Sequence, residues 1–397
     1  MRWSLSILFA TAGRRRACLI ALLVTAAGTW LVWRNMRARQ LRIERAISRV
    51  DEFGGGVGFE PGALSDGFSD VWNQAIRPAF RKLSLRLPRF SARSGTVDRV
   101  YLWDTQFGDD DLALLEPFEG LETLILRNAK TTDQAISYLS RFPKLKGLYL
   151  DGTAVSPGGL RDLPQLRNLE RLGLAGLTIN DADCHQISQL DHLQHLDLND
   201  ARVSDQGIGH LCRSKSLALL ELSGATIGDA AAAHLAKLKN LRYVSLNDTG
   251  VTDAGIAQLV QAPNLQILLL SGTGVTGSGF ADWDAEAPLD QLQLSRTTLT
   301  DEGLRHVAQL SRLVRLKIDR TETTDRGIAH LSRLRQLRFL DLCKTRVSND
   351  GLAAFRSGEL YVDATGTNIT TEDAEKLEND APGLDVTTGK ARKPWSW

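Results

Sequence analysis

Apolar residues recur along most of this chain at a fixed interval of 24 residues. Eleven blocks follow one another without an insertion, beginning at Val97 and then at a leucine every 24 residues through Leu337. The fourth position of each block is Leu or Val, and the sixth is Leu or Ile. Side chains alternate between the two faces of a strand, so positions four and six share a buried face. Positions three, five and seven therefore lie on the opposite face.

The second half of each block has the pattern of a helix. A hydroxyl residue followed by Asp is a helix-start pattern, because the side-chain oxygen accepts a free backbone N–H and the acid suits the positive helix end. We expect such N-caps at four sites: Ser204-Asp205, Thr252-Asp253, Thr300-Asp301 and Thr324-Asp325. The block over 265–288 has Gly277 and Trp283 in place of the usual Asp and Leu, so we expect a short or irregular helix there.

Two small residues recur at fixed places and predict contacts between blocks. Glycine stands in the first helical turn of several blocks, where close packing against the neighbouring block is the expected reason. These glycines include Gly255, Gly303, Gly327 and Gly351. Threonine recurs at position nine, where its hydroxyl is expected to satisfy backbone groups of the turn. These threonines are Thr153, Thr249, Thr273, Thr297, Thr321 and Thr345.

A strand and a helix repeated in register form a parallel sheet lined by parallel helices. Strands stack about 4.8 Å apart, whereas helices need roughly 8–10 Å. The helix side is wider, so the sequence predicts an α/β solenoid curved like a horseshoe, with the sheet on the concave face and the helices on the convex face.

The pattern L-x-x-L-x-L-x-x-T-x-V-T-D-x-G-L-x-x-L resembles leucine-rich repeats of the 24-residue type common in bacterial proteins, over roughly residues 97–386. The hydrophobic segment, the arginine-rich stretch after it and the sequence from Gly54 to Phe59 are similar to a bacterial group of membrane-anchored leucine-rich repeat proteins. The resemblance implies this fold and protein binding, and it carries over no catalytic residue.

The pattern divides the chain into five parts. They are a basic tail (1–16), a transmembrane helix (17–33), a basic juxtamembrane helix with an N-terminal cap (34–96), the repeats with a degenerate C-terminal cap repeat (97–386) and a loose tail (387–397). Residues 34–50 are expected to form an amphipathic helix with Ile43, Ile47 and Val50 on one side. Caps are expected because a solenoid exposes a core edge at each end.

The uncharged run from Ala17 to Trp33 spans about 25 Å as a helix, at the short end for a bilayer. A cleaved signal peptide ending near Val24-Thr25-Ala26 is the alternative interpretation. The arginines that follow the run favour a retained, single-pass anchor and repeats on the cytoplasmic side, although Arg14, Arg15 and Arg16 before it oppose that orientation.

Charge and motifs narrow the function. Residues 1–96 hold 16 Lys and Arg against 6 Asp and Glu, whereas residues 97–397 hold 32 against 41. The repeats are therefore acidic, which argues against nucleic-acid binding. No nucleophile elbow, phosphate loop or paired metal motif is present, so we expect no enzyme activity, cofactor, metal site or small-molecule substrate. The four cysteines show no disulfide framework.

Three surface groups are candidate interaction sites. On the inner face we expect Tyr101, Trp103, Ile125 and Tyr149 to bind a protein, unless the cap covers them. A basic patch, alternatively a solvated face, comprises Arg296, Arg315, Lys317, Arg320 and Lys344. A run that is a candidate lipid-surface contact, or a solvated cap, comprises Arg77, Arg81, Lys82, Arg86, Arg89 and Arg93.

These observations predict a membrane-anchored scaffold that presents a concave surface to a protein partner. The alternative is a structural, envelope-associated solenoid that self-associates or lies on lipid without a specific partner.

Overall fold

The computed structural model describes residues 34–59, 97–355 and 359–389. The chain forms two compact units, one of residues 1–100 with 110–120 and one of 101–109 with 121–397. The expected tail (1–16), membrane span (17–33) and lipid-surface arginines lie outside the described residues. Within the described residues, no helix has both the length and the apolar character needed to cross a bilayer.

The first unit contains the expected amphipathic helix. Residues 34–52 are helical. Ile47 and Val50 are buried and Ile43 is half-buried, which confirms the predicted apolar side. This unit also contains strand β1 (Gly56–Phe59). Strand β2 (Val97–Tyr101) and the 3-10 helix η2 (Asp109–Leu115) lie where the chain passes from one unit to the other.

The second unit is a parallel sheet with one helix or helical turn after each strand but the last. Its strands are β3 (Thr123–Ile125), β4 (Gly147–Tyr149), β5 (Arg171–Gly173), β6 (His195–Asp197), β7 (Leu219–Glu221), β8 (Tyr243–Ser245), β9 (Ile267–Leu269), β10 (Gln291–Gln293), β11 (Arg315–Lys317), β12 (Phe339–Asp341), β13 (Leu360–Asp363) and β14 (Leu384–Thr387). Each strand pairs in parallel with the next one along the chain.

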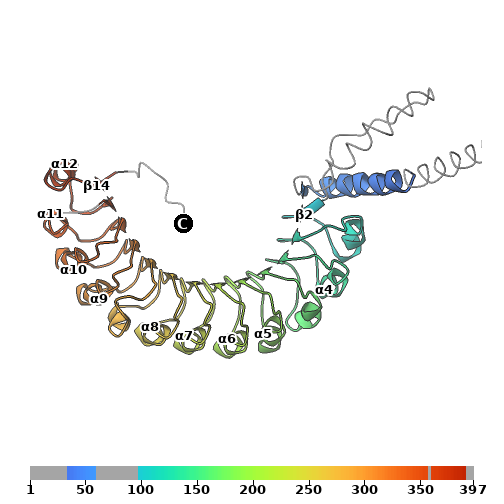
Figure 1. Ribbon diagram of the computed structural model, residues 1–397, viewed down its shortest axis with the longest axis horizontal. Coiled ribbons are helices and arrows are strands. Elements are labelled where there is room, and N and C mark those ends of the chain that lie inside the picture. Colours follow the sequence, from blue (N-terminus) through green and yellow to red (C-terminus); the bar gives the residue numbers. More distant parts are fainter. Residues whose placement is uncertain (1–33, 60–96, 356–358, 390–397) are drawn as a thin grey trace, which may run out of the picture. The chain divides into compact units, whose positions relative to one another are not determined.

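The helices lie on the outer side of this unit and the strands on its inner side, as predicted (Figure 1). The helical elements are α4 (Asp133–Leu139), η3 (Gly159–Gln165), α5 (Asp181–Ile187), α6 (Asp205–Leu211), α7 (Asp229–Leu235), α8 (Asp253–Leu259), η4 (Ser278–Phe280), α9 (Asp301–Val307), α10 (Asp325–Leu331), α11 (Asn349–Leu352) and α12 (Thr371–Asp380). Most are only seven residues long, so packing on neighbours rather than helix propensity holds them.

The core is built from the predicted columns. The side chains at positions four and six of all eleven blocks are at most 1% exposed. The position-nine threonines donate to the carbonyl three residues earlier, with oxygen–oxygen distances of 2.6–2.7 Å. This confirms the predicted role of their hydroxyls in the turn that follows each strand.

The aspartates that start the helices reach the next repeat. Asp229 Oδ1 accepts the N–H of Thr252 at 2.7 Å and that of Gly255 at 3.0 Å, and Asp229 Oδ2 accepts the Thr252 hydroxyl. A Cβ on Gly255 would lie 2.6 Å from Asp229 Oδ1, and one on Gly327 would lie 2.4 Å from Asp301 Oδ1. The recurring glycines are therefore required by close packing between repeats, as predicted.

Several local expectations need correction. The helix of the first block is the 3-10 helix η2, and that of the block beginning at Leu145 is the 3-10 helix η3, which contains Pro164. Thr324 occupies an N-cap position, but its hydroxyl donates to Asp301 and makes no capping bond. The cap repeat is two residues short, because Phe339 pairs with Tyr361, and β14 continues to Thr387, one residue into the expected tail.

The irregular block was predicted correctly. Its helical segment, η4, has only three residues and follows Gly277, whose φ is +95°. Trp283 replaces the usual leucine and is 6% exposed. Its indole N–H donates to the carbonyl of Ile256 at 3.1 Å, so the larger side chain anchors this segment to the preceding repeat.

Candidate protein-binding surface

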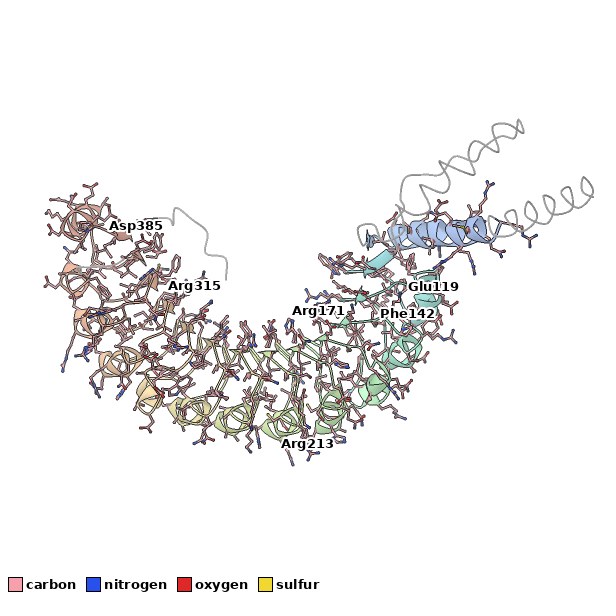
Figure 2. All side chains as sticks on the ribbon, in the orientation of Figure 1. Glu119, Phe142, Arg171, Arg213, Arg315 and Asp385 are labelled. Carbon is pink, nitrogen blue, oxygen red and sulfur yellow. The ribbon has the colours of Figure 1, made fainter. Side chains whose placement is uncertain are left out.

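The inner face of the second unit consists of side chains at positions three, five and seven. The register aligns these positions from strand to strand, so residues from distant parts of the sequence form continuous columns. Figure 2 shows Arg171 and Arg315 on the inner side and Arg213 on the outer side. A rigid sheet of this kind holds the side chains of its inner face in fixed positions before a partner binds.

The predicted aromatic group is assembled at the start of this face. Tyr101 and Trp103 pack edge to face with ring centroids 6.1 Å apart, and Trp103 is 55% exposed. The Leu102 N–H donates to the Ile125 carbonyl at 2.8 Å, and Ile125 pairs with Tyr149. Tyr101, Ile125 and Tyr149 therefore lie on successive strands, and Trp103 follows the end of the first of these strands.

Two charged residues that the sequence pattern did not predict also belong to this group. The Arg127 guanidinium lies 5.3 Å from the centroid of the Tyr149 ring, and Arg127 Nε donates to Asp151 Oδ2 at 2.6 Å. Both residues stand at position seven of adjacent blocks, next to the aromatic side chains. The only clue in the sequence was their place at position seven, which lies on the inner face.

An acidic group follows on β6 and β7. Asp197 and Glu221 pair across the two strands, and His195 Nε2 lies 3.0 Å from Glu221 Oε1. Burial raises the pKa of Asp197, and the nearby Glu221 and Asp151 raise it further. The hydrogen bond with His195 lowers the pKa of Glu221, against the effect of burial. The sequence pattern did not predict this acidic group.

Apolar side chains lie between the acidic group and the predicted basic patch. Leu219, Tyr243 and Ile267 are successive partners in one column, and Leu269 lies in the other column of β9. Leu219 is 40% exposed, and the other three are half-buried. The sequence pattern did not predict this apolar group either. An apolar residue outside the core positions cannot be distinguished, in the sequence, from ordinary variation between repeats.

The predicted basic patch forms around β10, β11 and β12. The Arg315 guanidinium lies 5.2 Å from the centroid of the Phe339 ring, and Lys317 Nζ lies 3.8 Å from Asp341 Oδ2. The other three members, Arg296, Arg320 and Lys344, stand at position eight of successive blocks. Their φ angles are +54° to +57°, a backbone conformation that residues other than glycine adopt infrequently.

The comparison with known families agrees with this architecture. A family model described as a leucine-rich repeat region matches residues 105–364. The chain belongs to the leucine-rich repeat family. A search of curated proteins finds no match. The crystal structure of an internalin from Listeria monocytogenes aligns with a TM-score of 0.56 and 18% identity, over 84% of this chain and 97% of the internalin chain. At that identity the likeness shows the fold alone.

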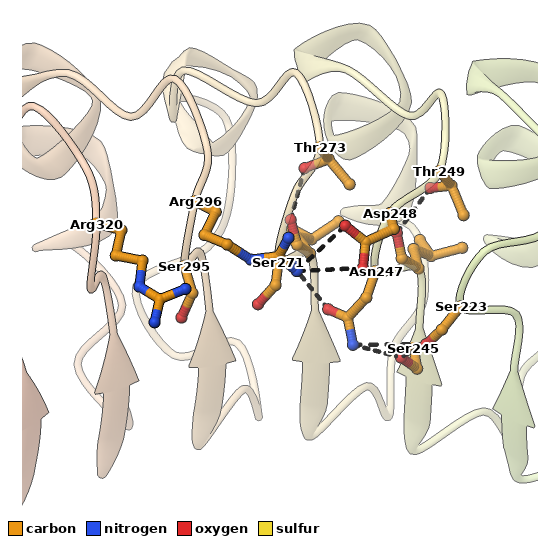
Figure 3. A network of polar contacts seen from close by, with 12 residues as sticks. Ser223, Ser245, Asn247, Asp248, Thr249, Ser271, Thr273, Ser295, Arg296 and Arg320 are labelled. Atoms are coloured by element: carbon orange, nitrogen blue, oxygen red, sulfur yellow. Dashed lines mark hydrogen bonds and ion pairs between the residues drawn. The ribbon is translucent and has the colours of Figure 1, made fainter.

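The leucine-rich repeats carry a polar network along position seven (Figure 3). Asn247 Oδ1 accepts the Ser271 N–H at 2.7 Å, and Asn199 Oδ1 accepts the Ser223 N–H at 2.8 Å. The Asn247 amide also donates to Ser245 Oγ at 3.0 Å. These side chains satisfy backbone donors of the following repeat, which makes the middle of this column structural.

One group in the described part of the chain brings metal-ligand atoms within 4.8 Å of one another: Asp341, Cys343 and Asp363. Asp341 Oδ1 accepts the Cys343 N–H at 3.1 Å, and Asp363 Oδ1 accepts the Thr365 N–H at 3.0 Å. Burial and the two carboxylates raise the pKa of the Cys343 thiol. The local hydrogen bonds account for the two aspartates.

Proposed function

We propose that this leucine-rich repeat protein is a membrane-anchored scaffold that binds a protein partner through its inner face. The observation that carries the proposal is the Tyr101–Trp103 pair, in which Trp103 is 55% exposed at the end of a strand of the sheet. Large aromatic side chains on preorganised surfaces are typical anchors of protein interfaces, because they bury much area at little cost in conformational entropy.

The anchor in this proposal is the segment from Ala17 to Trp33, which places the protein in the membrane as a single-pass chain with its repeats on the cytoplasmic side. The charge of the first 96 residues supports it, since 16 Lys and Arg surround and follow this segment. The scaffold acts by presenting side chains rather than by chemistry, so the proposal assigns no enzyme activity.

Affinity capture from native membranes tests the proposal. We expect the wild-type chain to enrich a protein that the Tyr101→Ala/Trp103→Ala/Tyr149→Ala chain does not enrich. Tyr138→Ala is a matched control, because Tyr138 also stacks with an arginine, Arg141, but lies on helix α4. Thermal unfolding of each variant checks the fold. Equal recovery of self-associated or lipid-associated material by all three chains would contradict the proposal and favour a structural solenoid.

A further inference from the structure

We propose that strands β6 to β12 bind one segment of a protein partner that has basic side chains at one end, apolar side chains in the middle and acidic side chains at the other end. This inference rests on the proposed function and concerns a different part of the inner face. Three groups define the surface. The acidic end is Asp197 and Glu221, the apolar centre is Leu219, Tyr243, Ile267 and Leu269, and the basic end is the predicted basic patch.

The order of the three groups follows from the strand register. In one column Glu221 is followed by Ser245, Leu269, Gln293 and Lys317, each on the next strand. In the other column Leu219 is followed by Tyr243, Ile267, Gln291 and Arg315. The first column therefore begins with an acid and the second with an apolar residue. Both continue through uncharged residues and reach a cation on β11, along one uninterrupted sheet.

The acidic end favours a cation from the partner. Asp197 and Glu221 lie side by side on β6 and β7, and His195 contacts only the second of them through a hydrogen bond. Asp197 Oδ1 accepts the N–H of Asn199 at 3.0 Å, which holds its carboxylate in place. A lysine or arginine placed over this pair would offset the repulsion between the two carboxylates.

The basic end favours an acidic group. Three of its five cations lie 3.1–3.9 Å from Asp248, Asp319 or Asp341, and the charge of Arg315 acts on Asp290, so five cations face four aspartates in this set. Three consecutive repeats keep a long cation at a left-handed position, although Gly272 occupies it in the preceding repeat. That conformation is unfavourable for a residue with a Cβ, and the ion pair with Asp248 accounts for Arg296 but not for Arg320 or Lys344.

The apolar centre supplies the interface core between the two charged ends. Interfaces characteristically have an apolar centre and a polar rim, and Leu219 is among the large apolar side chains of the described residues that remain exposed. Five strand steps from β6 to β11 cover about 24 Å, which corresponds to roughly seven residues of an extended partner segment. A nucleic acid would place phosphates against the acidic end, so a protein segment is the occupant that fits.

A random peptide library tests the inference without a known partner. Displayed peptides of 16 residues are selected on the full chain in detergent micelles. We expect enriched peptides to carry Lys or Arg and Asp or Glu about seven residues apart, with apolar residues between. Selection on Asp197→Asn/Glu221→Gln should lose the basic residues and keep the acidic ones. Selection on Arg315→Gln/Lys317→Gln should do the reverse.

Binding constants of the enriched peptides complete the test. We expect at least tenfold weaker binding to Leu219→Ser/Ile267→Ser and unchanged binding to Tyr101→Ala/Trp103→Ala/Tyr149→Ala. The second result separates this surface from the aromatic one, so either proposal can fail alone. Circular dichroism confirms that each variant is folded. No enrichment on the wild-type chain, enriched peptides without the charge pattern, or peptides indifferent to the charge variants would overturn the inference.

Discussion

The guanidinium of Arg296 lies 3.1 Å from the carboxylate of Asp248, although the two residues are two repeats apart (Figure 3). Gly272 stands between them at the same repeat position. A Cβ on Gly272 would lie 2.1 Å from Asp248 Oδ1 and 3.4 Å from Arg296 Nη2. The missing side chain of one repeat therefore makes room for an ion pair between its neighbours.

The same relationship recurs without an arginine. A Cβ on Gly224 would lie 2.1 Å from Asp200 Oδ1, and one on Gly152 would lie 2.0 Å from Asn128 Oδ1. In these three pairs, position eight thus follows a rule in which an Asp or Asn in one repeat is followed by a glycine in the next. Asp104 is instead followed by Asn128, whose side-chain amide donates to Asp104 Oδ1 at 2.7 Å. All of these positions have positive φ, which favours glycine for a second reason.

Gly272→Ala tests this rule. We expect a loss of about 1–3 kcal/mol in the free energy of unfolding, because the new Cβ meets Asp248 and the residue is held at φ +72°. Urea unfolding followed by circular dichroism measures it. Gly274→Ala is the matched control, since its Cβ would meet nothing closer than 3.8 Å. Equal stability of the two variants would contradict the rule.

Asp253→Asn should weaken the contact between helix α8 and the next repeat. Its carboxylate accepts four hydrogen bonds at 2.7–3.0 Å, from Thr276, Gly277 and Gly279. An amide offers one acceptor oxygen in place of two, so we expect a loss of about 1–3 kcal/mol at pH 7. Asp282→Asn, at an exposed aspartate in the following block, is the control and should change little.

The effect of Asp253 should also depend on pH. Burial alone would raise its pKa, but the hydrogen bonds from Thr276, Gly277 and Gly279 together lower it below 3.8. A lowered pKa in the folded state means that its contribution is present above about pH 4 and is lost as the pH falls through the lowered value. The stability difference between wild type and Asp253→Asn should shrink from pH 7 to pH 3. A constant difference would show that the ionised carboxylate is not the stabilising form.

Arg320→Gly should stabilise the fold, unlike most substitutions of large residues. Its φ is +54°, and glycine adopts this conformation without the steric cost of a Cβ. Arg320 Nε lies 3.9 Å from Asp319, and more than half of its side chain is exposed, so little ion-pair energy is lost. We expect a gain of about 0.5–1 kcal/mol in thermal unfolding. Arg338→Gly, at a position without positive φ, should not show that gain.

Cys184 and Cys212 should react slowly with thiol reagents in the folded protein. Burial raises the pKa of each thiol to about 12, and Asp181 and Asp183 add to the effect at Cys184. At pH 8 about one molecule in ten thousand then carries the reactive thiolate. Isotope-coded alkylation with mass spectrometry measures each cysteine separately. Labelling in urea provides the reference, and equal rates with and without urea would contradict the expectation.

Leu198→Ala tests the assignment of the core columns. Leu198 stands at position six and is 0% exposed, so its truncation should cost about 2–5 kcal/mol. Leu219→Ala is the matched control on the opposite face of the sheet, where the side chain is 40% exposed, and it should cost much less. The midpoint of urea unfolding distinguishes the two, and an unchanged midpoint for Leu198→Ala would refute the predicted register.

The sequence by itself determined the repeat, the core columns and the positions that form the inner face of the sheet. Each of these depends on periodicity and on the alternation of side chains along a strand. It located Tyr101 and Trp103 on the inner face and explained Thr249 and Gly255 correctly for the same reason. It also identified the irregular block from Gly277 and Trp283, because both depart from the Asp and Leu that are usual at their positions.

Only the tertiary structure decided which residues of different repeats meet. Asp229 acts on the following repeat, Gly272 makes room for Arg296 and Asp248, and Leu219 joins Tyr243 and Ile267 in an exposed apolar column. These relationships connect residues 23 to 48 positions apart, and they depend on the spacing and rotation between repeats. A sequence pattern fixes the contents of each repeat, but the stacking of repeats is set by packing, so these contacts appear only in three dimensions.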